Sequence, residues 1–213
     1  MYRFVISGLF VILMVGAAFA DSEYRPPAVG TQITWQEPSY ETGADAPASK
    51  TRVSQVVGQG KDFAIYLFDI GYDVEKPTSF FAEFSGIHVT SCATEMPTEN
   101  EREDLQRFWP LQTGASLQIG NEETFLTTYE VGQRTVHAVS QIDGDRPAQL
   151  ISVKEGDFSS DVMLSLDWGM PVLRTYGNGD NVRAIELFSP TIPANLSEAD
   201  RVALGECAKL LEE

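Results

Sequence analysis

Few residues of this 213-residue chain could carry catalysis or bind a metal. Its two histidines are His88 and His137, and its two cysteines are Cys92 and Cys207. His88 and Cys92 stand four positions apart, which would place both side chains on one face of either a strand or a helix. A zinc site needs further ligands and a free thiolate. We therefore interpret His88 as a strand histidine and expect neither a metal site nor a cofactor.

A serine hydrolase would need a nucleophile, a base and an acid brought together from distant positions. The sequence has no G-x-S-x-G motif, in which a sharp turn presents a nucleophilic serine. His137 lies in the strand-like segment 135–139, which has no adjacent pattern of acids or nucleophiles. We assign no catalytic residue, and a hydrolase of unknown substrate stays an alternative interpretation.

The acidic residues outnumber the basic ones, 31 against 15, so the formal net charge is −16. Nucleic acids and anionic lipid surfaces would repel such a chain, and we exclude both as partners. The segments 143–145 and 178–181 offer oxygen ligands that calcium prefers, but they lack the spacing of the twelve-residue calcium loop and are interpreted as turns. The acidic cluster 95–104 is interpreted as a solvated helix face, with docking of a basic partner protein as the alternative.

The first twenty residues are typical of a secretory signal peptide. Arg3 precedes an apolar stretch from Phe4 to Val15, and an A-x-A pattern ends at Ala20. The stretch is shorter than the roughly 20 residues of a stable membrane span. We expect cleavage after Ala20, a periplasmic or secreted mature protein and no later membrane span. An uncleaved anchor is the alternative.

Export changes the interpretation of the two cysteines. In an oxidising compartment an even, minimal number of cysteines favours a structural disulfide over free thiols. We therefore predict a bond between Cys92 and Cys207. It would tie the C-terminal segment to the middle of the chain.

The rest of the chain is predicted to form one β-rich domain over residues 31–213, after an extended leader at 21–30. Glycine, proline, asparagine and aspartate separate short segments with β-type hydrophobic patterns. The expected strands are 31–35, 51–57, 62–69, 80–89 with a bend at Gly86, 115–119, 124–131, 135–141, 149–154, 161–168, 172–176 and 182–188. The fold class is therefore mainly β, as an antiparallel sandwich or a half-barrel.

Two helices are expected beside the strands. Thr98 and Glu101 form a capping box that begins a short central helix, which Pro110 prevents from continuing past residue 109. A second capping box begins a predicted C-terminal helix over residues 197–212. The apolar face predicted for this second helix consists of Ala199, Ala203, Cys207 and Leu210.

The two halves of the domain show short matches in the same order. Gly30 and Gly114 each open a strand-like segment, and the tripeptide Val57-Gly58-Gln59 recurs at 131–133. These matches predict a duplicated β unit, with copies at 30–91 and 114–188. The alternative is that a strand-rich chain produces such glycine-containing matches by chance.

Two short motifs of this chain resemble segments of other proteins. The segment 108–114 reads FWPLQTG, and the segment 166–172 reads LDWGMPV. They resemble a W-P-L-x-x-G opening and a later aromatic-G-x-P-V segment of uncharacterised secreted or periplasmic bacterial proteins. The resemblance covers the chain between the two motifs. It implies a β-rich exported domain and supplies no activity or catalytic residue.

The leading functional interpretation is a non-enzymatic binding or assembly protein that presents β surface and acidic loops to another envelope protein. The alternative is a carrier for lipid or another apolar ligand in a curved sheet. That alternative rests on an aromatic-rich set that could equally form a core packed on both sides. The set consists of Phe63, Tyr66, Phe68, Phe80, Phe81 and Phe84. The sequence does not identify which residues bind a ligand.

Overall fold

Antiparallel strands joined into a single curved sheet make up most of the protein, as a computed structural model shows. The structure describes residues 23–38, 49–68, 79–120, 126–138, 145–177, 181–188 and 195–212. The predicted signal peptide, residues 1–20, lies outside them. Within the described ranges, no helix has the length and apolar character needed to cross a membrane.

The first half of the chain supplies five strands and one helix. They are β1 (Gln32–Pro38), β2 (Ser49–Gln59), β3 (Phe63–Phe68), β4 (Ser79–Phe84), β5 (His88–Ser91) and α1 (Glu99–Arg107). The second half supplies β6 (Ser116–Ile119), β7 (Thr127–His137), β8 (Arg146–Glu155), β9 (Phe158–Ser165), β10 (Met170–Tyr176) and β11 (Asn181–Phe188). Two short helices follow, α2 (Glu198–Ala203) and α3 (Cys207–Leu210). The predicted class, mainly β and antiparallel with short helices, is confirmed.

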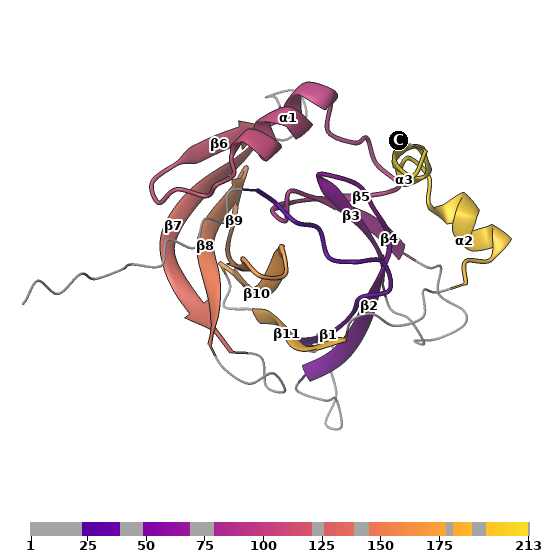
Figure 1. The fold of residues 1–213 in the computed structure, drawn as a ribbon, viewed down its shortest axis with the longest axis horizontal. Coiled ribbons are helices and arrows are strands. Elements are labelled where there is room, and N and C mark those ends of the chain that lie inside the picture. The colour runs from indigo at the N-terminus through magenta and orange to yellow at the C-terminus, as the bar shows by residue number, and fades with distance from the viewer. Residues whose placement is uncertain are drawn as a thin grey trace, which may run out of the picture.

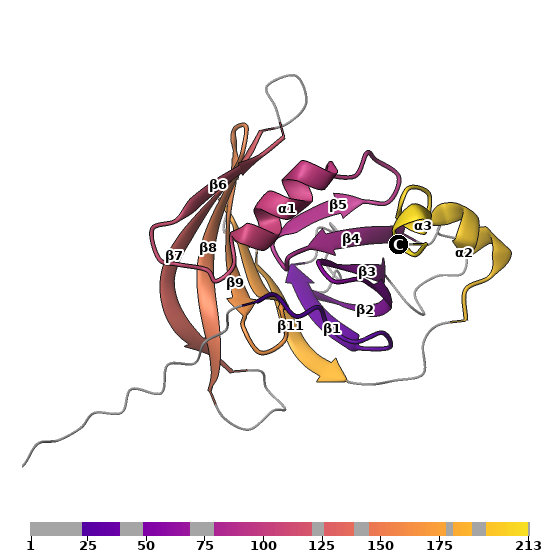
Figure 2. The same ribbon diagram turned by 45° about the horizontal axis from the view of Figure 1, so that its top comes forward.

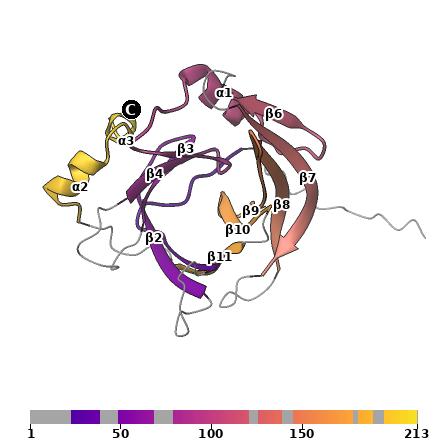
Figure 3. The same cartoon turned by 180° about the vertical axis from the view of Figure 1, so that it is seen from behind.

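The strand order makes β5 and β6 the two edges of the sheet. The order is β5-β4-β3-β2-β1-β11-β10-β9-β8-β7-β6, so strands that are consecutive in sequence pair with each other, except β5 and β6, and β11 pairs with β1. The sheet is strongly curved, so that its two edges approach the same side of the molecule (Figure 1). The helix α1 connects β5 to β6 and lies beside both edges. The helices α2 and α3 lie outside the curl, on the side of β4 (Figure 3).

Strand β3 is buried on both faces. Phe63, Ile65 and Leu67 belong to one hydrophobic cluster, together with residues from α1 and α3. The alternating residues Ala64 and Tyr66 belong to a second cluster. Because successive strand side chains point to opposite faces, one face of β3 packs in the cluster that contains α1, α3 and strands β6 to β9, and the second face packs with residues of β1, β2 and β10. This arrangement agrees with the sequence interpretation of a core packed on both sides.

The segment 80–89 forms a hairpin rather than one bent strand. Ser85 and Gly86 have φ angles of 50° and 73°, and Ile87 N donates to Phe84 O at 3.1 Å. A Cβ atom on Gly86 would lie 2.7 Å from the carbonyl oxygen of Gly169. The prediction of a bend was wrong because this left-handed turn reverses the chain completely.

The two strands predicted at 124–131 and 135–141 are one strand, β7. Its pairing with β8 shifts register between Val131 and Arg134, which marks a β-bulge. A Cβ atom on Gly132 would lie 3.2 Å from Leu150 Cβ. Gly132 therefore permits close approach of β8 inside a continuous strand.

The predicted C-terminal helix is broken in two. Gly205 has φ +48°, and a Cβ atom there would lie 2.5 Å from Cys92 O. Glu206 N donates to the same carbonyl at 3.0 Å. Cys207 and Leu210 are buried as predicted, but Ala199 and Ala203 are exposed. The chain bends at Gly205 because α3, and not α2, packs on the core.

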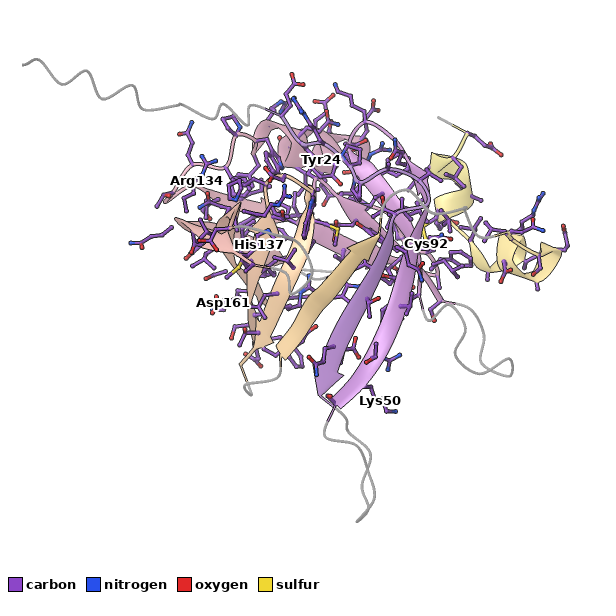
Figure 4. The ribbon with its side chains drawn as sticks, turned by 60° about the horizontal axis from the view of Figure 1, so that its bottom comes forward. Tyr24, Lys50, Cys92, Arg134, His137 and Asp161 are labelled. Atoms are coloured by element: carbon purple, nitrogen blue, oxygen red, sulfur yellow. A yellow bond between two sulfur atoms is a disulfide. The ribbon has the colours of Figure 1, made fainter. Side chains whose placement is uncertain are left out.

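A disulfide bond joins Cys92 to Cys207 across 115 positions of sequence. Cys92 directly follows β5, and Cys207 begins α3. Figure 4 places Cys92 beside the C-terminal helices. The bond therefore links those helices to the end of the edge strand β5.

The segment predicted as an extended leader contacts the core. Tyr24 is buried, and its ring centroid lies 5.9 Å from that of Trp109. Trp109 in turn donates from Nε1 to Ser85 O at 3.0 Å. Residues 24–28 form neither helix nor strand, but Tyr24 packs in the core cluster and Ala28 O accepts from Thr31 N at 3.0 Å.

Two hydrogen-bonded turns repeat between the halves of the chain. Gly30 N donates to Val56 O at 2.8 Å, and Gly114 N donates to Val131 O at 2.8 Å. Val56 N and Val131 N return bonds of 2.9 Å to the residue after each glycine. The predicted duplication stays a prediction. This shared pattern agrees with it and makes Val56, rather than Val57, the counterpart of Val131.

Candidate binding groove

A groove of about 1670 Å³ opens between the two edges of the sheet. It is lined by all of β5, by the start of α1 with its preceding loop, and by the ends of β6 to β10 nearest to them. Figure 2 shows α1 lying beside β5 and β6. The curvature of the sheet thus brings together residues that are far apart in sequence, such as Glu37, His88 and Tyr176.

The groove is rich in carboxylates. Five acidic side chains line it, namely Glu37, Glu95, Glu101, Glu155 and Asp157. Among the described residues that line it, Arg174 is the one arginine or lysine. Glu37 is neutralised by Arg52, whose Nε lies 2.6 Å from Glu37 Oε2. The remaining acidic groups give the groove a negative charge that would attract a cationic ligand.

His88 lies in the groove and contacts β7. Its Nδ1 is 2.6 Å from the Tyr129 hydroxyl, and the two rings meet edge to face. Burial lowers the pKa of His88 and raises the pKa of the Tyr129 phenol. At neutral pH the phenol therefore keeps its proton and the imidazole is neutral, and the imidazole tautomer sets which of the two atoms donates. This bond joins β5 to β7 across the gap between the sheet edges.

Glu101 joins the helix α1 to the end of β6. Its Oε2 accepts from Thr98 N at 2.8 Å in the predicted capping box, and its Oε1 accepts from Gly120 N at 2.8 Å. Burial alone would raise the pKa of Glu101. The hydrogen bonds from Thr98 and Gly120 outweigh it and lower that pKa. Glu101 is therefore ionised at neutral pH, and its charge raises the pKa of nearby His88.

A buried carboxyl group lies on β4. Glu83 is 4% exposed, and its Oε1 accepts from the Tyr66 hydroxyl at 3.2 Å. Burial raises the pKa of Glu83 to about 7, although Arg174 and the Tyr66 hydrogen bond act in the opposite direction. Arg174 therefore acts electrostatically on Glu83 while it lines the groove.

Exposed large apolar side chains also line the groove. Phe158, at the start of β9, is 83% exposed, and Val89 on β5 and Tyr176 on β10 are 37% and 38% exposed. All three line the groove. An exposed aromatic side chain at a binding surface is a common anchor for a partner.

The structure separates the candidate residues that the sequence singled out. His88 lies in the groove, whereas His137 packs against Trp168 with their ring centroids 5.1 Å apart. Cys92 and Cys207 are bonded to each other. Within the part of the chain that the structure describes, no group of three or more potential ligands could hold a metal ion.

The acidic cluster 95–104 divides between two environments. Glu95 and Glu101 line the groove, whereas Glu103 and Asp104 form exposed ion pairs with Arg107. The turn residues 143–144 and 178–180 lie outside the described residues. Sequence reasoning missed Tyr129, Glu155 and Arg174, because nothing in their local patterns distinguishes them from other strand residues.

No protein-family model and no curated protein matches the sequence. Among solved structures, the chain is similar to MucB, with a TM-score of 0.36 and 12% identity over 84% of this chain and 60% of that one. It is also similar to the hypothetical lipoprotein YmcC from Escherichia coli, with a TM-score of 0.44 and 7% identity over 81% of this chain and 95% of that one. A third similar structure is an exported Bacteroides fragilis protein with a YmcC-like fold, at a TM-score of 0.34 and 9% identity over 79% and 100%. The chain thus spans about three fifths of the length of the MucB chain that it matches.

Proposed function

We propose that the protein is a non-enzymatic binding protein of an exported compartment, and that its groove holds a basic segment of a partner protein. The observation that carries the proposal is the excess of carboxylates along the groove. Glu95, Glu155 and Asp157 are exposed there, and Arg174 is the one described basic residue that lines it.

Charge complementarity of this kind sets specificity and the rate of encounter. Lysine or arginine side chains of a partner would meet several carboxylates at once, and the net charge of −16 would draw a cationic segment toward the protein. The same field would repel anionic competitors. Binding should therefore be fast at low ionic strength and weaken as salt screens the charges.

The apolar-carrier alternative is less well supported by the position of the aromatic residues. Phe63, Phe80 and Phe84 belong to the core cluster that α1 and α3 cover. Tyr66 belongs to the second cluster, and Phe81 packs against it. None of these residues, nor Phe68, is among the described residues that line the groove. In the described part of the chain, most of these aromatic side chains pack in the two hydrophobic clusters, which does not favour the carrier alternative.

The test is binding of a fluorescently labelled peptide with alternating lysine and valine, followed by fluorescence anisotropy. A triple variant with Glu95→Gln, Glu155→Gln and Asp157→Asn should bind about tenfold more weakly, since loss of several favourable charge contacts amounts to about 1.4 kcal/mol or more. These three side chains are exposed, so the fold should not change.

A matched control removes three exposed charges elsewhere, with Glu103→Gln, Glu198→Gln and Glu212→Gln. None of these residues lines the groove. The control should change the affinity by less than about twofold, because distant exposed charges are screened at moderate salt. Equal effects of the two triple variants, or no binding by the wild-type protein, would contradict the proposal.

A further inference from the structure

The edge strand β5 presents unpaired backbone to the groove. It is the terminal strand of the sheet, and all four of its residues line the groove. Its pairing with β4 places Val89 opposite Glu83 and Thr90 opposite Ala82. Among the described residues, no strand pairs with the other side of β5.

The phase of the β4–β5 ladder identifies which backbone groups face outward. Cys92 N donates to Phe80 O at 3.0 Å, so this pair is hydrogen-bonded. Hydrogen-bonded pairs in an antiparallel ladder recur at every second residue. Thr90 and His88 are therefore the β5 residues that bond to β4. The N–H and C=O groups of Val89, and the N–H of Ser91, point away from β4.

The two edges of the sheet differ in their backbone groups. At the end of β6, the Gly120 N–H is bonded to Glu101 Oε1. On β5, the outward N–H and C=O of Val89 face the groove, so we take β5 as the edge that receives a partner.

We propose that the basic segment of the partner binds as an added antiparallel β-strand on β5. This inference rests on the proposed function and specifies how the groove engages its partner. A residue opposite Val89 would form two backbone hydrogen bonds, and the Ser91 N–H would form a third. An alternating sequence would present basic side chains on one face of the added strand. It would place apolar side chains on the other face.

The occupant is therefore an extended segment in which lysine or arginine alternates with β-branched residues. Charge complementarity with the acidic lining favours such a segment over an acidic or neutral one. The exposed Val89 side chain, which lines the groove, would contact its apolar residues.

The test removes one outward backbone donor. Val89→Pro deletes the N–H that faces the groove and leaves the β4–β5 hydrogen bonds in place, and edge strands tolerate proline on their free side. Val89→Thr is the matched control, because it retains the N–H and the β-branched shape. The alternating lysine-valine peptide should bind Val89→Pro about tenfold more weakly than Val89→Thr. In the wild-type protein, binding should slow hydrogen exchange at the amides of Val89 and Ser91 about tenfold or more.

The outcomes separate the two proposals. Strand addition is overturned if the Val89 amide exchanges equally fast with and without peptide while the groove triple variant still weakens binding; the proposed function then stands. Equal affinities of Val89→Pro and Val89→Thr would also overturn it. If Val89→Pro does not fold, hydrogen exchange at Val89 in the wild-type protein still tests whether the peptide adds to β5. Absence of any peptide binding would overturn both proposals.

Discussion

Arg102 on α1 binds Asp62, the residue before β3, through two parallel hydrogen bonds. Nε lies 2.8 Å from Oδ2, and Nη2 lies 2.9 Å from Oδ1. The guanidinium carbon also lies 5.6 Å from the ring centroids of both Phe63 and Phe84. Since Asp62 is only 3% exposed, this pair fastens α1 to the β3–β4 end of the sheet and so helps to shape the groove.

Replacing Arg102 by methionine should therefore destabilise the protein. The change leaves the buried Asp62 carboxylate without its ionic partner, which costs about 3 kcal/mol or more. Urea denaturation at pH 7 measures the effect. Arg107→Met on the same helix is the control, because its exposed ion pairs with Glu103 and Asp104 should contribute less than about 1 kcal/mol. Equal losses in the two variants would contradict the assigned role of Arg102.

Glu83 should make stability depend on pH. Its native pKa is about 7, above the ordinary value of 4.5, so the folded protein retains a proton that the unfolded chain releases. The free energy of unfolding should fall by roughly 3 kcal/mol in total as the pH rises from 4.5 to 7. Above pH 7 it should level off. Glu83→Gln keeps a hydrogen-bond acceptor for Tyr66 and should abolish this contribution.

Urea denaturation of both proteins at pH 5 and pH 8 measures the Glu83 contribution. The free energy of unfolding of Glu83→Gln, relative to that of the wild-type protein, should be higher at pH 8 than at pH 5. The same pH dependence in both proteins would show that Glu83 is not the group responsible.

His88 should titrate below its ordinary pKa. Burial lowers its pKa from 6.5, and the charge of Glu101 partly opposes that shift. Glu101→Gln keeps a residue suited to the capping box but removes the charge, so the pKa of His88 should fall further. NMR titration of the imidazole protons measures the pKa of His88 in the wild-type protein and in Glu101→Gln.

His137 is the internal control for that titration, since the chain has two histidines. Burial lowers the pKa of His137 as well, with Asp167 and Arg146 as its charged neighbours. Glu101→Gln should therefore leave it unchanged. A His88 pKa at or above 6.5 in the wild-type protein would contradict the burial seen in the structure.

Loss of the disulfide between Cys92 and Cys207 should lower the free energy of unfolding by roughly 2–5 kcal/mol. The bond closes a loop across 115 positions, which restricts the unfolded chain. Denaturation with and without reductant measures the loss. The double variant Cys92→Ala, Cys207→Ala should be unaffected by reductant. A wild-type midpoint that does not move after complete reduction would contradict the prediction.

Local sequence patterns predicted the elements whose signals lie within a few residues. The capping box of Thr98 and Glu101 begins α1 as expected, because both partners fall within one helical turn. The alternation of Phe63, Ile65 and Leu67 with Tyr66 and Phe68 indicated a strand covered on both faces, and the first three residues and Tyr66 do belong to two different clusters. These features need no information about distant parts of the chain.

Errors arose where a distant contact decides the local geometry. The break in the C-terminal helix depends on Cys92 O, which accepts from Glu206 N and leaves no room for a side chain at position 205. The bulge in β7 depends on close approach of β8 at Gly132. In both cases a glycine was visible in the sequence, but the atom that requires it lies far away along the chain.

The sequence alone specified the mainly β class, the acidic charge and the presence of short capped helices, because composition and spacing within one turn or strand are local properties. Tertiary structure decided the groove. His88, Tyr129 and Arg174 meet there because β11 pairs with β1, and because the sheet curls until its edges β5 and β6 face a common space. Strand pairing and curvature are set by contacts between segments far apart in sequence, so no local pattern could reveal this site.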